Sequence, residues 1–295
     1  MGGTLYSHED RSVRAASAGY FTKSADDIFI QNKKREIHES MEPSKALLRE
    51  SRDSDVHPLS VPIIIALDVT GSMRRIPHYL VKEGLPNTVG GIVQKGVLDP
   101  AILFLAIGDH ECDHYPLQVG QFESGDAELD LWLTRTYLEG GGGGNDGESY
   151  LLAWYFAANH TVTDSWDKRK EKGFLFTIGD EPCLRHLPNT SLKEIMGEGP
   201  QGSLTDKQLL EMAQEKYNVY HLHVMEGSAG ERSLGYWKQL LGDHCIVIKD
   251  HTEISQKIAD IVVDNTKAKK PAGKVTTKPI VLTEDKPKPD ETDML

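Results

Sequence analysis

Three short segments of the sequence carry oxygen-bearing side chains that could together bind a metal ion. The first reads DVTGS at positions 68–72 and follows the apolar run at 61–67. At the end of an extended strand, residues i, i+2 and i+4 point to one side, so Asp68, Thr70 and Ser72 would present a carboxylate and two hydroxyls together. Hard oxygen ligands of this mix suit Mg²⁺, Mn²⁺ or Ca²⁺. The simpler interpretation is that Asp68 and Ser72 cap the following helix.

The second and third segments come later in the chain and favour the metal interpretation. The glycine-rich stretch at 142–149, GGGNDGES, has the backbone freedom for a close approach to a ligand, and Asn145 or Asp146 could supply an oxygen. Asp180 closely follows the apolar run FLFTI at 174–178. In an open parallel sheet, ligands bind beyond the carboxyl ends of the strands, where Asp68 and Asp180 would both lie. Taken alone, each segment also fits an ordinary polar loop.

The elements that would position these segments alternate between strand and helix. Short apolar, β-branched runs indicate buried strands, and amphipathic stretches with capping residues indicate helices. Such alternation predicts a doubly wound, Rossmann-like α/β fold, with a mainly parallel sheet and helices on both faces. The expected strands are 61–67, 101–107, 117–122, 174–178, 219–225 and 245–248, and the expected helices are 77–95, 127–138, 149–159, 204–217, 230–241 and 252–266.

The domain organisation follows from where this alternation begins and ends. Residues 1–59 are polar and have too few large apolar side chains to close a core, so we expect an arm packed on the core, with a helix at about 25–45. Residues 60–266 form the expected α/β domain. From 267 to 295 the chain is rich in Lys, Pro, Asp, Glu and Thr, a composition typical of a disordered tail.

The order and spacing of the three segments resemble the von Willebrand factor A (vWA) family and its metal-ion-dependent adhesion site. That family carries D-x-[ST]-x-S after the first strand, a Thr in a glycine-rich loop and an Asp after the fourth strand. Asp68, Thr70 and Ser72 match the first element. Asp180 matches the last, although Gly-Asp-Glu replaces the usual Thr-Asp-Gly, and Asn145 stands where the family has Thr. The segments DVTGSM and GGG-x-x-x-E are most similar to those of intracellular bacterial and phage members.

The resemblance covers about residues 60–265 and implies a cytoplasmic, metal-dependent protein-interaction module, an adaptor rather than an enzyme. Asp68 and Asp180 would bind Mg²⁺ (or Mn²⁺ or Ca²⁺) through water, and Thr70 and Ser72 directly, with Asn145 as the middle ligand. An Asp or Glu of a protein partner would fill the open coordination position, and MoxR-type AAA+ ATPases are partners of such relatives. Candidates for supporting the ligands or contacting the partner are Asp109, His110, Asp146, Glu148 and Glu181.

A competing motif lies at 110–114, where HECDH matches the H-E-x-x-H signature of zinc proteases. That motif works because two histidines at i and i+4 share one face of a helix, with a glutamate beside them as general base. Here the motif follows a strand-like run, Gly108 and Asp109 interrupt the pattern, and Pro116 comes soon after. A zinc-dependent hydrolase therefore remains the alternative function, and a scaffold protein with a vestigial metal site is the second alternative.

Composition and charge narrow the choice of partner and compartment. The chain of 295 residues has a formal net charge of -12, which argues against nucleic acid and anionic membranes as partners because like charges repel. No apolar run approaches the roughly 18 residues that a membrane span needs, and the N-terminal segment lacks the apolar stretch of a secretory signal. The three widely spaced cysteines argue against a disulfide framework and fit the cytoplasm.

Overall fold

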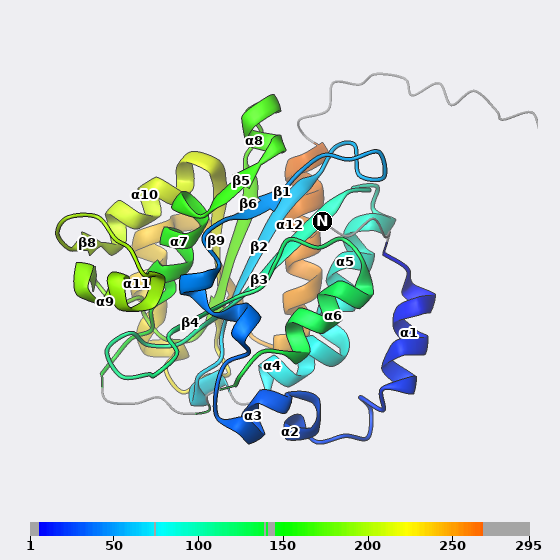
Figure 1. Ribbon diagram of the computed structural model, residues 1–295, viewed down its shortest axis with the longest axis horizontal. Coiled ribbons are helices and arrows are strands. Elements are labelled where there is room, and N and C mark those ends of the chain that lie inside the picture. The colour runs from blue at the N-terminus through cyan, green and yellow to red at the C-terminus, as the bar shows by residue number, and fades with distance from the viewer. Residues whose placement is uncertain (1–5, 74, 139, 141–144, 268–295) are drawn as a thin grey trace, which may run out of the picture.

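A six-stranded, mainly parallel sheet runs through the centre of the molecule (Figure 1). The computed structural model describes residues 6–73, 75–138, 140 and 145–267. The strand order is β10-β9-β6-β2-β3-β4, and only β4 runs antiparallel, beside β3. From β2 the chain proceeds outward in one direction through β3 and in the other through β6, so the topological switch point lies between β2 and β6. The strands are β2 (Val61–Asp68), β3 (Pro100–Ile107), β4 (Leu117–Val119), β6 (Gly173–Gly179), β9 (Tyr217–Val224) and β10 (Cys245–Ile248).

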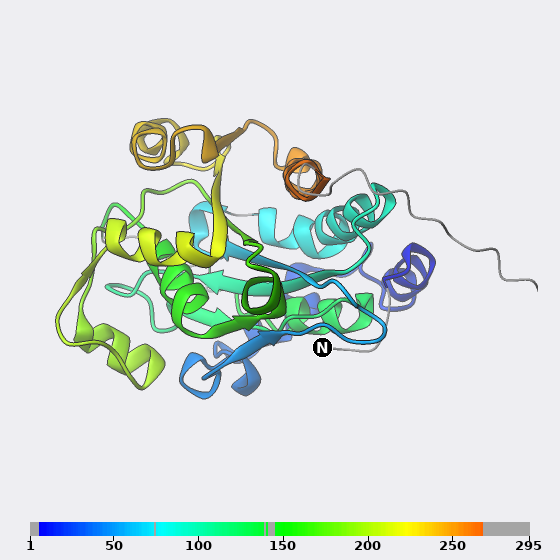
Figure 2. The same cartoon turned by 90° about the horizontal axis from the view of Figure 1, so that it is seen from above.

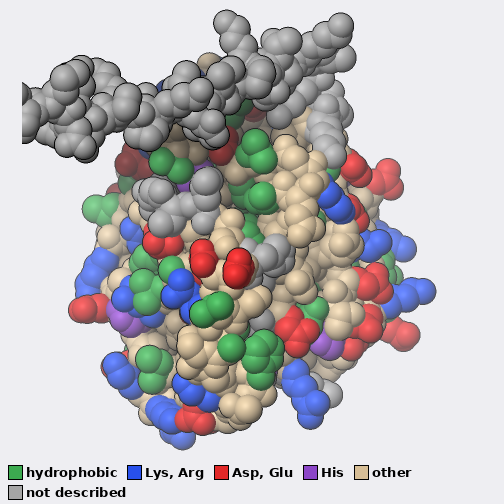
Figure 3. All heavy atoms as spheres, turned by 90° about the vertical axis from the view of Figure 1, so that its right-hand side faces the viewer, with side chains coloured by type: hydrophobic (Ala, Val, Ile, Leu, Met, Phe, Trp, Pro, Cys, Tyr) green, Lys and Arg blue, Asp and Glu red, His purple; other side chains and the backbone are tan. Residues whose placement is uncertain are grey.

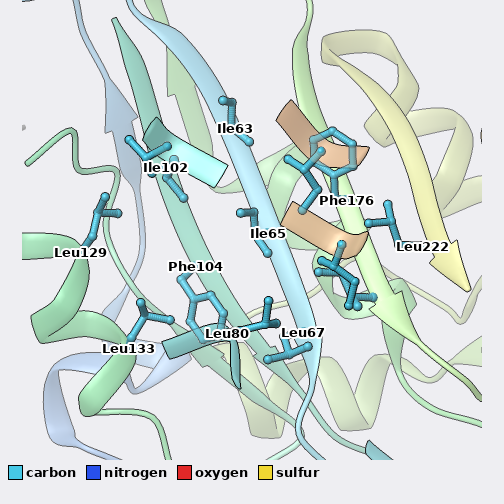
Figure 4. Close-up of a cluster of buried hydrophobic side chains, with 14 of the residues drawn as sticks. Ile63, Ile65, Leu67, Leu80, Ile102, Phe104, Leu129, Leu133, Phe176 and Leu222 are labelled. Carbon is cyan, nitrogen blue, oxygen red and sulfur yellow. The ribbon is translucent and has the colours of Figure 1, made fainter. Parts of the chain in front are cut away.

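The central strands bury side chains on both faces of the sheet. On one face, Ile63, Ile65 and Leu67 of β2 pack with apolar residues of the neighbouring strands (Figure 4). On the other face, Ile64 and Ala66 belong to a second buried cluster. Because a strand covered on both sides needs apolar residues at successive positions, the run VPIIIAL reads as continuous rather than alternating. This two-sided burial confirms the Rossmann-like α/β fold predicted from the sequence.

Helices cover both faces of the sheet (Figure 2). The cluster around Ile63 receives side chains from α1 (His8–Ser17), α4 (Ile76–Tyr79), α5 (Leu85–Gln94), α6 (Asp126–Thr134) and α12 (Ile254–Lys267). The opposite cluster receives them from α7 (Tyr150–Asn159), α9 (Asn189–Met196), α10 (Asp206–Lys216) and α11 (Gly230–Leu241). A π-helical turn, Leu80–Gly84, joins α4 to α5, so the helix expected at 77–95 is one continuous helical stretch.

The N-terminal arm does not form the single helix expected at 25–45, so this prediction was wrong. Two short helices, α2 (Ala25–Ile28) and α3 (Ile30–Lys34), are followed by two 3-10 turns, Glu39–Met41 and Pro43–Lys45. The chain turns at Arg35, whose φ of 54° is left-handed and ends α3. These breaks allow both Phe29 and Met41 to be buried, which a straight helix of that length would not achieve.

Two sets of contacts join the arm to the rest of the molecule. Helix α1 packs against α5 and α6, where buried Arg11 forms an ion pair with Asp130 of α6. The Tyr20 hydroxyl donates a 2.7 Å hydrogen bond to the same carboxylate. Further along, β1 (Arg49–Ser51) pairs in parallel with β5 (Thr161–Thr163) in a small separate ladder. These contacts connect α1, Tyr20 and β1 of the arm to the core.

Several elements end or begin at other residues than the sequence predicts. Strand β4 stops at Val119. Helix α6 stops at Thr134 rather than Leu138, because the Gln118 side chain holds Tyr137 outside the helix. The Tyr137 N–H donates to Gln118 Oε1 at 2.9 Å, and Gln118 Nε2 donates to the Tyr137 C=O at 2.7 Å. Helix α10 begins after Thr205, which forms a capping box with Gln208. Helices and strands that the sequence did not reveal are α1, β1, β5, α8 (Asp164–Arg169), α9, β7 (His186–Leu187) and β8 (Leu204–Thr205).

Some expectations fall where the structure gives no description. Glycines 141–144 lie outside the described residues, and so does the tail predicted to be disordered, apart from its first residue at the end of α12. Among the described residues, no helix is long and apolar enough to cross a membrane. On the face drawn in Figure 3, acidic and basic side chains are interspersed.

Candidate metal centre

Asp68 is the last residue of β2 and is wholly buried at the carboxyl edge of the sheet. Its Oδ1 accepts hydrogen bonds from the backbone N–H of Thr70 at 2.9 Å and from the Thr70 hydroxyl at 2.7 Å. The chain then enters the 3-10 turn Gly71–Met73, which places the Ser72 hydroxyl 3.3 Å from that of Thr70. The tight turn after the strand, and not an extended strand end, therefore brings one carboxylate and two hydroxyls together.

Asp180 follows β6, the strand next to β2, and is also fully buried. Its Oδ1 accepts a 2.7 Å hydrogen bond from the Ser72 hydroxyl, and its Oδ2 accepts one of 3.1 Å from the Ala229 N–H. Gly227 lies directly over this carboxyl group, since a Cβ there would stand 2.1 Å from Asp180 Oδ2. The first and third segments thus meet at the switch point between β2 and β6, where open α/β sheets bind ligands.

Tyr150 completes the support of Asp68, and the sequence analysis missed it. Its buried hydroxyl donates a 2.9 Å hydrogen bond to Asp68 Oδ2 from the first turn of α7. Gly179 makes room for the ring, because a Cβ at that position would lie 1.7 Å from the Tyr150 hydroxyl oxygen. The available signal was the apolar stretch that follows, LLAWYFAA, which fits a helix buried on all sides. The hydroxyl of a tyrosine at the start of such a buried helix needs a hydrogen-bond partner inside the protein.

Glu148 comes from the glycine-rich segment and lies between two strand ends. Its N–H donates to Pro182 O at 2.9 Å and its C=O accepts from Leu184 N–H at 3.0 Å, both in the loop after β6. On the other side, the N–H of Ser149 donates to Gly108 O, just beyond β3, at 3.0 Å. Glu148 is 5% exposed, and its Oε2 is buried with no hydrogen-bond partner among the described residues.

The buried carboxyl groups strongly perturb one another. Burial raises the pKa of Asp68 to about 7, against hydrogen bonds from Thr70 that lower it, and the charge of Asp180 raises it further. Burial also raises the pKa of Glu148 to about 10, with further increases from the charges of Asp68, Asp113 and Asp109. Apart from hydrogen bonds, the main influences on both pKa values are therefore burial and neighbouring acids. Such a cluster of acids favours either protons or a cation.

The remaining residues of the glycine-rich segment lie nearer to solvent. The Asn145 amide donates to Glu111 Oε2 at 2.8 Å, and in the described part of the chain no hydrogen bond joins it to Asp68 or Asp180. Arg232 of α11 binds both Asp146, at 3.2 Å, and Glu181, at 2.6 Å. The Asp146 side chain is 83% exposed. The structure therefore places these groups around the buried cluster, and the assignment of Asn145 as a ligand remains a prediction.

The HECDH segment forms a turn, not a helix. Asp109 Oδ1 accepts the Glu111 N–H at 2.8 Å, and Asp113 Oδ2 accepts the Asp109 N–H at 2.7 Å. The Ser149 hydroxyl lies 2.8 Å from the His110 N–H and 2.7 Å from its Nδ1. The two histidines of the motif therefore do not share a helical face, which is the arrangement that zinc proteases of this signature require. Buried Asp109 and half-buried His110 instead flank the segment that carries Glu148.

Comparisons with known proteins give similarity in structure alone. No family model matches the sequence, and no curated protein matches it. Among solved structures, the vWF domain of the type V pili tip protein Mfa5 from Porphyromonas gingivalis has a TM-score of 0.47 at 11% identity, covering 74% of this chain and 98% of that one. The conserved hypothetical protein BatB from Bacteroides thetaiotaomicron has a TM-score of 0.43 at 13% identity, covering 70% and 100%.

A longer protein gives a partial match. The pilus adhesin SpaC from Lactobacillus rhamnosus GG has a TM-score of 0.47 at 11% identity, with 74% of this chain matched to 32% of the adhesin. This chain therefore spans about a third of the SpaC chain. Similarity at this level carries no information about individual site residues, which must be argued from the chain itself.

Proposed function

We propose that this chain is a vWA-type protein-interaction module that holds one divalent cation, Mg²⁺ or Mn²⁺, at the edge of its sheet. The observation that carries the proposal is that two hydroxyls of one turn bind carboxylates at the ends of two neighbouring strands. Thr70 donates to Asp68, and Ser72 donates to Asp180. Two buried carboxylates and two hydroxyls from separate segments thus converge on one place. Oxygen donors of this kind match the preference of Mg²⁺, Mn²⁺ and Ca²⁺.

The donor set passes a simple test of fit for a cation. Buried carboxylates are stable only when paired, hydrogen-bonded or neutralised, and Glu148 Oε2 has no hydrogen-bond partner among the described residues. A divalent cation would neutralise the negative charge and use the oxygen atoms that face one another. It would also supply a Lewis-acidic position for an oxygen ligand from outside.

The surrounding residues would keep the ligands in place rather than bind the cation. The Tyr150 hydroxyl donates a hydrogen bond to Asp68 Oδ2, and the Ala229 N–H donates one to Asp180 Oδ2. With few charged ligands, the cation would keep a position for a carboxylate from a protein partner. A MoxR-type AAA+ ATPase in the cytoplasm is the partner that the family resemblance suggests. The turn at the HECDH segment supports this binding function over a zinc-dependent hydrolase.

Calorimetric titration of Mg²⁺, Mn²⁺ and Zn²⁺ into metal-stripped protein tests the proposal. We expect Mg²⁺ or Mn²⁺ binding in the wild type and in the control Asp167→Asn, whose side chain in α8 is 48% exposed, but not in Asp68→Ala. Circular dichroism would show whether the Asp68 variant is folded, and Asp68→Asn provides a second variant of the same shape. No Mg²⁺ or Mn²⁺ binding by the wild type would favour the vestigial scaffold. Zn²⁺ binding lost only in His110→Ala would favour the hydrolase.

A further inference from the structure

Among the described residues, Glu148 is the only candidate supporting carboxylate with a buried oxygen, Oε2, that has no hydrogen-bond partner. Its backbone is fixed by hydrogen bonds to Pro182 and Leu184 in the loop that begins with Asp180. The side chain therefore extends from a fixed point between the ends of β3 and β6. The Glu148 carboxylate is thus held close to Asp68. A third buried carboxylate is unfavourable there unless a positive charge lies between it and Asp68.

The Thr70 hydroxyl cannot satisfy both neighbouring carboxylates. It donates to Asp68 Oδ1 at 2.7 Å, and an interaction with the same hydroxyl lowers the pKa of Glu148. A hydroxyl has one proton to donate, so one of the two carboxylates must do without it. In the described part of the chain, Glu148 Oε2 has no hydrogen-bond partner. A cation placed between Asp68 and Glu148 would satisfy both groups and leave the Thr70 oxygen free to act as a ligand.

We propose that Glu148 is itself a ligand of the bound cation and occupies the coordination position that a partner's carboxylate would take. This inference rests on the proposed function, and it concerns how the site is regulated. The negative charges of Asp68, Asp180 and Glu148 together exceed the charge of one divalent cation, and the excess opposes the approach of a further carboxylate. An acidic partner would therefore have to displace the Glu148 side chain, so that the chain holds its cation firmly but binds carboxylates only in competition with its own glutamate.

The test compares Mn²⁺ binding and Mn²⁺ hydration in the wild type, Glu148→Gln, Glu148→Thr and the exposed control Asp167→Asn. Calorimetry gives the affinity, and water-proton relaxation reports how many exchangeable waters the bound Mn²⁺ carries. Loss of a group that merely supports a ligand typically weakens metal binding by about 10–100-fold, and we expect at least that for Glu148→Gln. The relaxation enhancement should rise, because water enters the position that Glu148 leaves. Asp167→Asn should match the wild type in both measurements.

Acetate serves as the carboxylate probe. In Glu148→Thr, which has a hydroxyl where the wild type has a carboxylate, acetate should lower the water relaxation of the Mn²⁺ complex at concentrations that leave the wild type unchanged. Equal acetate effects in the two proteins would show that Glu148 does not compete for the position. Thermal unfolding of the metal-free proteins checks the fold, and removal of a charge beside Asp68 should preserve or raise the melting temperature. Unfolded metal-free Glu148 variants would show a structural role instead.

The outcomes separate this inference from the proposed function. If Glu148→Gln binds Mn²⁺ with the affinity and hydration of the wild type while Asp68→Ala does not bind, Glu148 is not a ligand and the metal-dependent function stands. If the wild type binds no Mn²⁺, both the proposed function and the role of Glu148 are wrong. Weaker binding together with higher hydration in Glu148→Gln supports both.

Discussion

The Tyr150 hydroxyl donates a 2.9 Å hydrogen bond to Asp68 Oδ2, joining two residues that are 82 positions apart in the sequence. The contact depends on Gly179, where any Cβ would collide with the tyrosine hydroxyl. It connects the start of α7 to the end of β2. Because Oδ1 of Asp68 is held by Thr70, both carboxylate oxygens are fixed, and the group is oriented before any cation binds.

Tyr150→Phe should weaken Mn²⁺ or Mg²⁺ binding while leaving the fold intact. The phenylalanine keeps the buried ring but removes the donor that orients Asp68, and loss of such a supporting group typically costs about 10–100-fold in metal affinity. Calorimetry would measure the change. The matched control is Tyr155→Phe, which removes a hydroxyl from the same helix with no contact to Asp68. Equal affinities for the two variants would contradict the orienting role of Tyr150.

Gly227→Ala should also impair the candidate metal centre. Its Cβ would stand 2.1 Å from Asp180 Oδ2, so the carboxyl group must shift and lose its hydrogen bond with Ser72. We expect cation affinity to fall by about tenfold or more, as for loss of a supporting contact. Gly235→Ala, where a Cβ meets nothing within 4 Å, is the control. If both alanine variants bind Mn²⁺ like the wild type, Asp180 is not part of the site.

The sequence predicts the central sheet well because its strands are buried on both faces. Each of β2, β3 and β6 is a short run of apolar residues whose ends are marked by turn residues, a strong local signal. The arm and the small ladder of β1 with β5 carry no such signal. Strands of three residues gain their order from long-range contacts such as the pairing of Arg49 with Thr161. Their local sequence is therefore uninformative.

Only part of the candidate site can be predicted from the sequence, for a similar reason. Asp68, Thr70 and Ser72 lie on one turn, so their spacing reveals that they point together. Tyr150 and Glu148 reach the same place through the packing of α7 and through backbone hydrogen bonds to the loop after β6. The family resemblance placed Asn145 at the middle ligand position, but only the tertiary fold shows that Glu148 is buried and that Asn145 lies beside Glu111.

Asp130→Asn should destabilise the protein by separating the arm from α6. Asp130 is the counter-ion of Arg11, whose side chain is 6% exposed, and removing one partner of a buried pair costs about 3–5 kcal/mol. The Tyr20 hydroxyl could still donate to the asparagine oxygen, so the loss should reflect mainly the broken ion pair with Arg11. Urea denaturation would measure it. Asp27→Asn breaks an exposed pair with Lys33 and should leave the free energy of unfolding unchanged; a similar loss in both variants would refute this account.

Asp164, at the start of α8, should make stability depend on pH in the acidic range. Burial alone would raise its pKa, but hydrogen bonds from Lys168, the Asp53 N–H and Arg52 outweigh it and lower the pKa to about 2. An unfolded chain has an Asp pKa of about 3.9, so the folded form binds fewer protons. The stabilisation from this group is therefore complete above about pH 4 and is lost as the pH falls toward about 2.

The measurement is the difference in free energy of unfolding between the wild type and Asp164→Asn. That difference should favour the wild type by about 1–3 kcal/mol at neutral pH, the range for hydrogen bonds to a charged group. It should narrow as the pH falls from about 4 toward about 2, because the carboxylate is protonated first in the unfolded chain and only at lower pH in the folded protein. Asp167→Asn is the control, because its side chain is 48% exposed and lies 3.5 Å from Arg52. A difference for Asp164→Asn that stays constant over this acidic range would show that its carboxylate is not selectively stabilised in the folded protein.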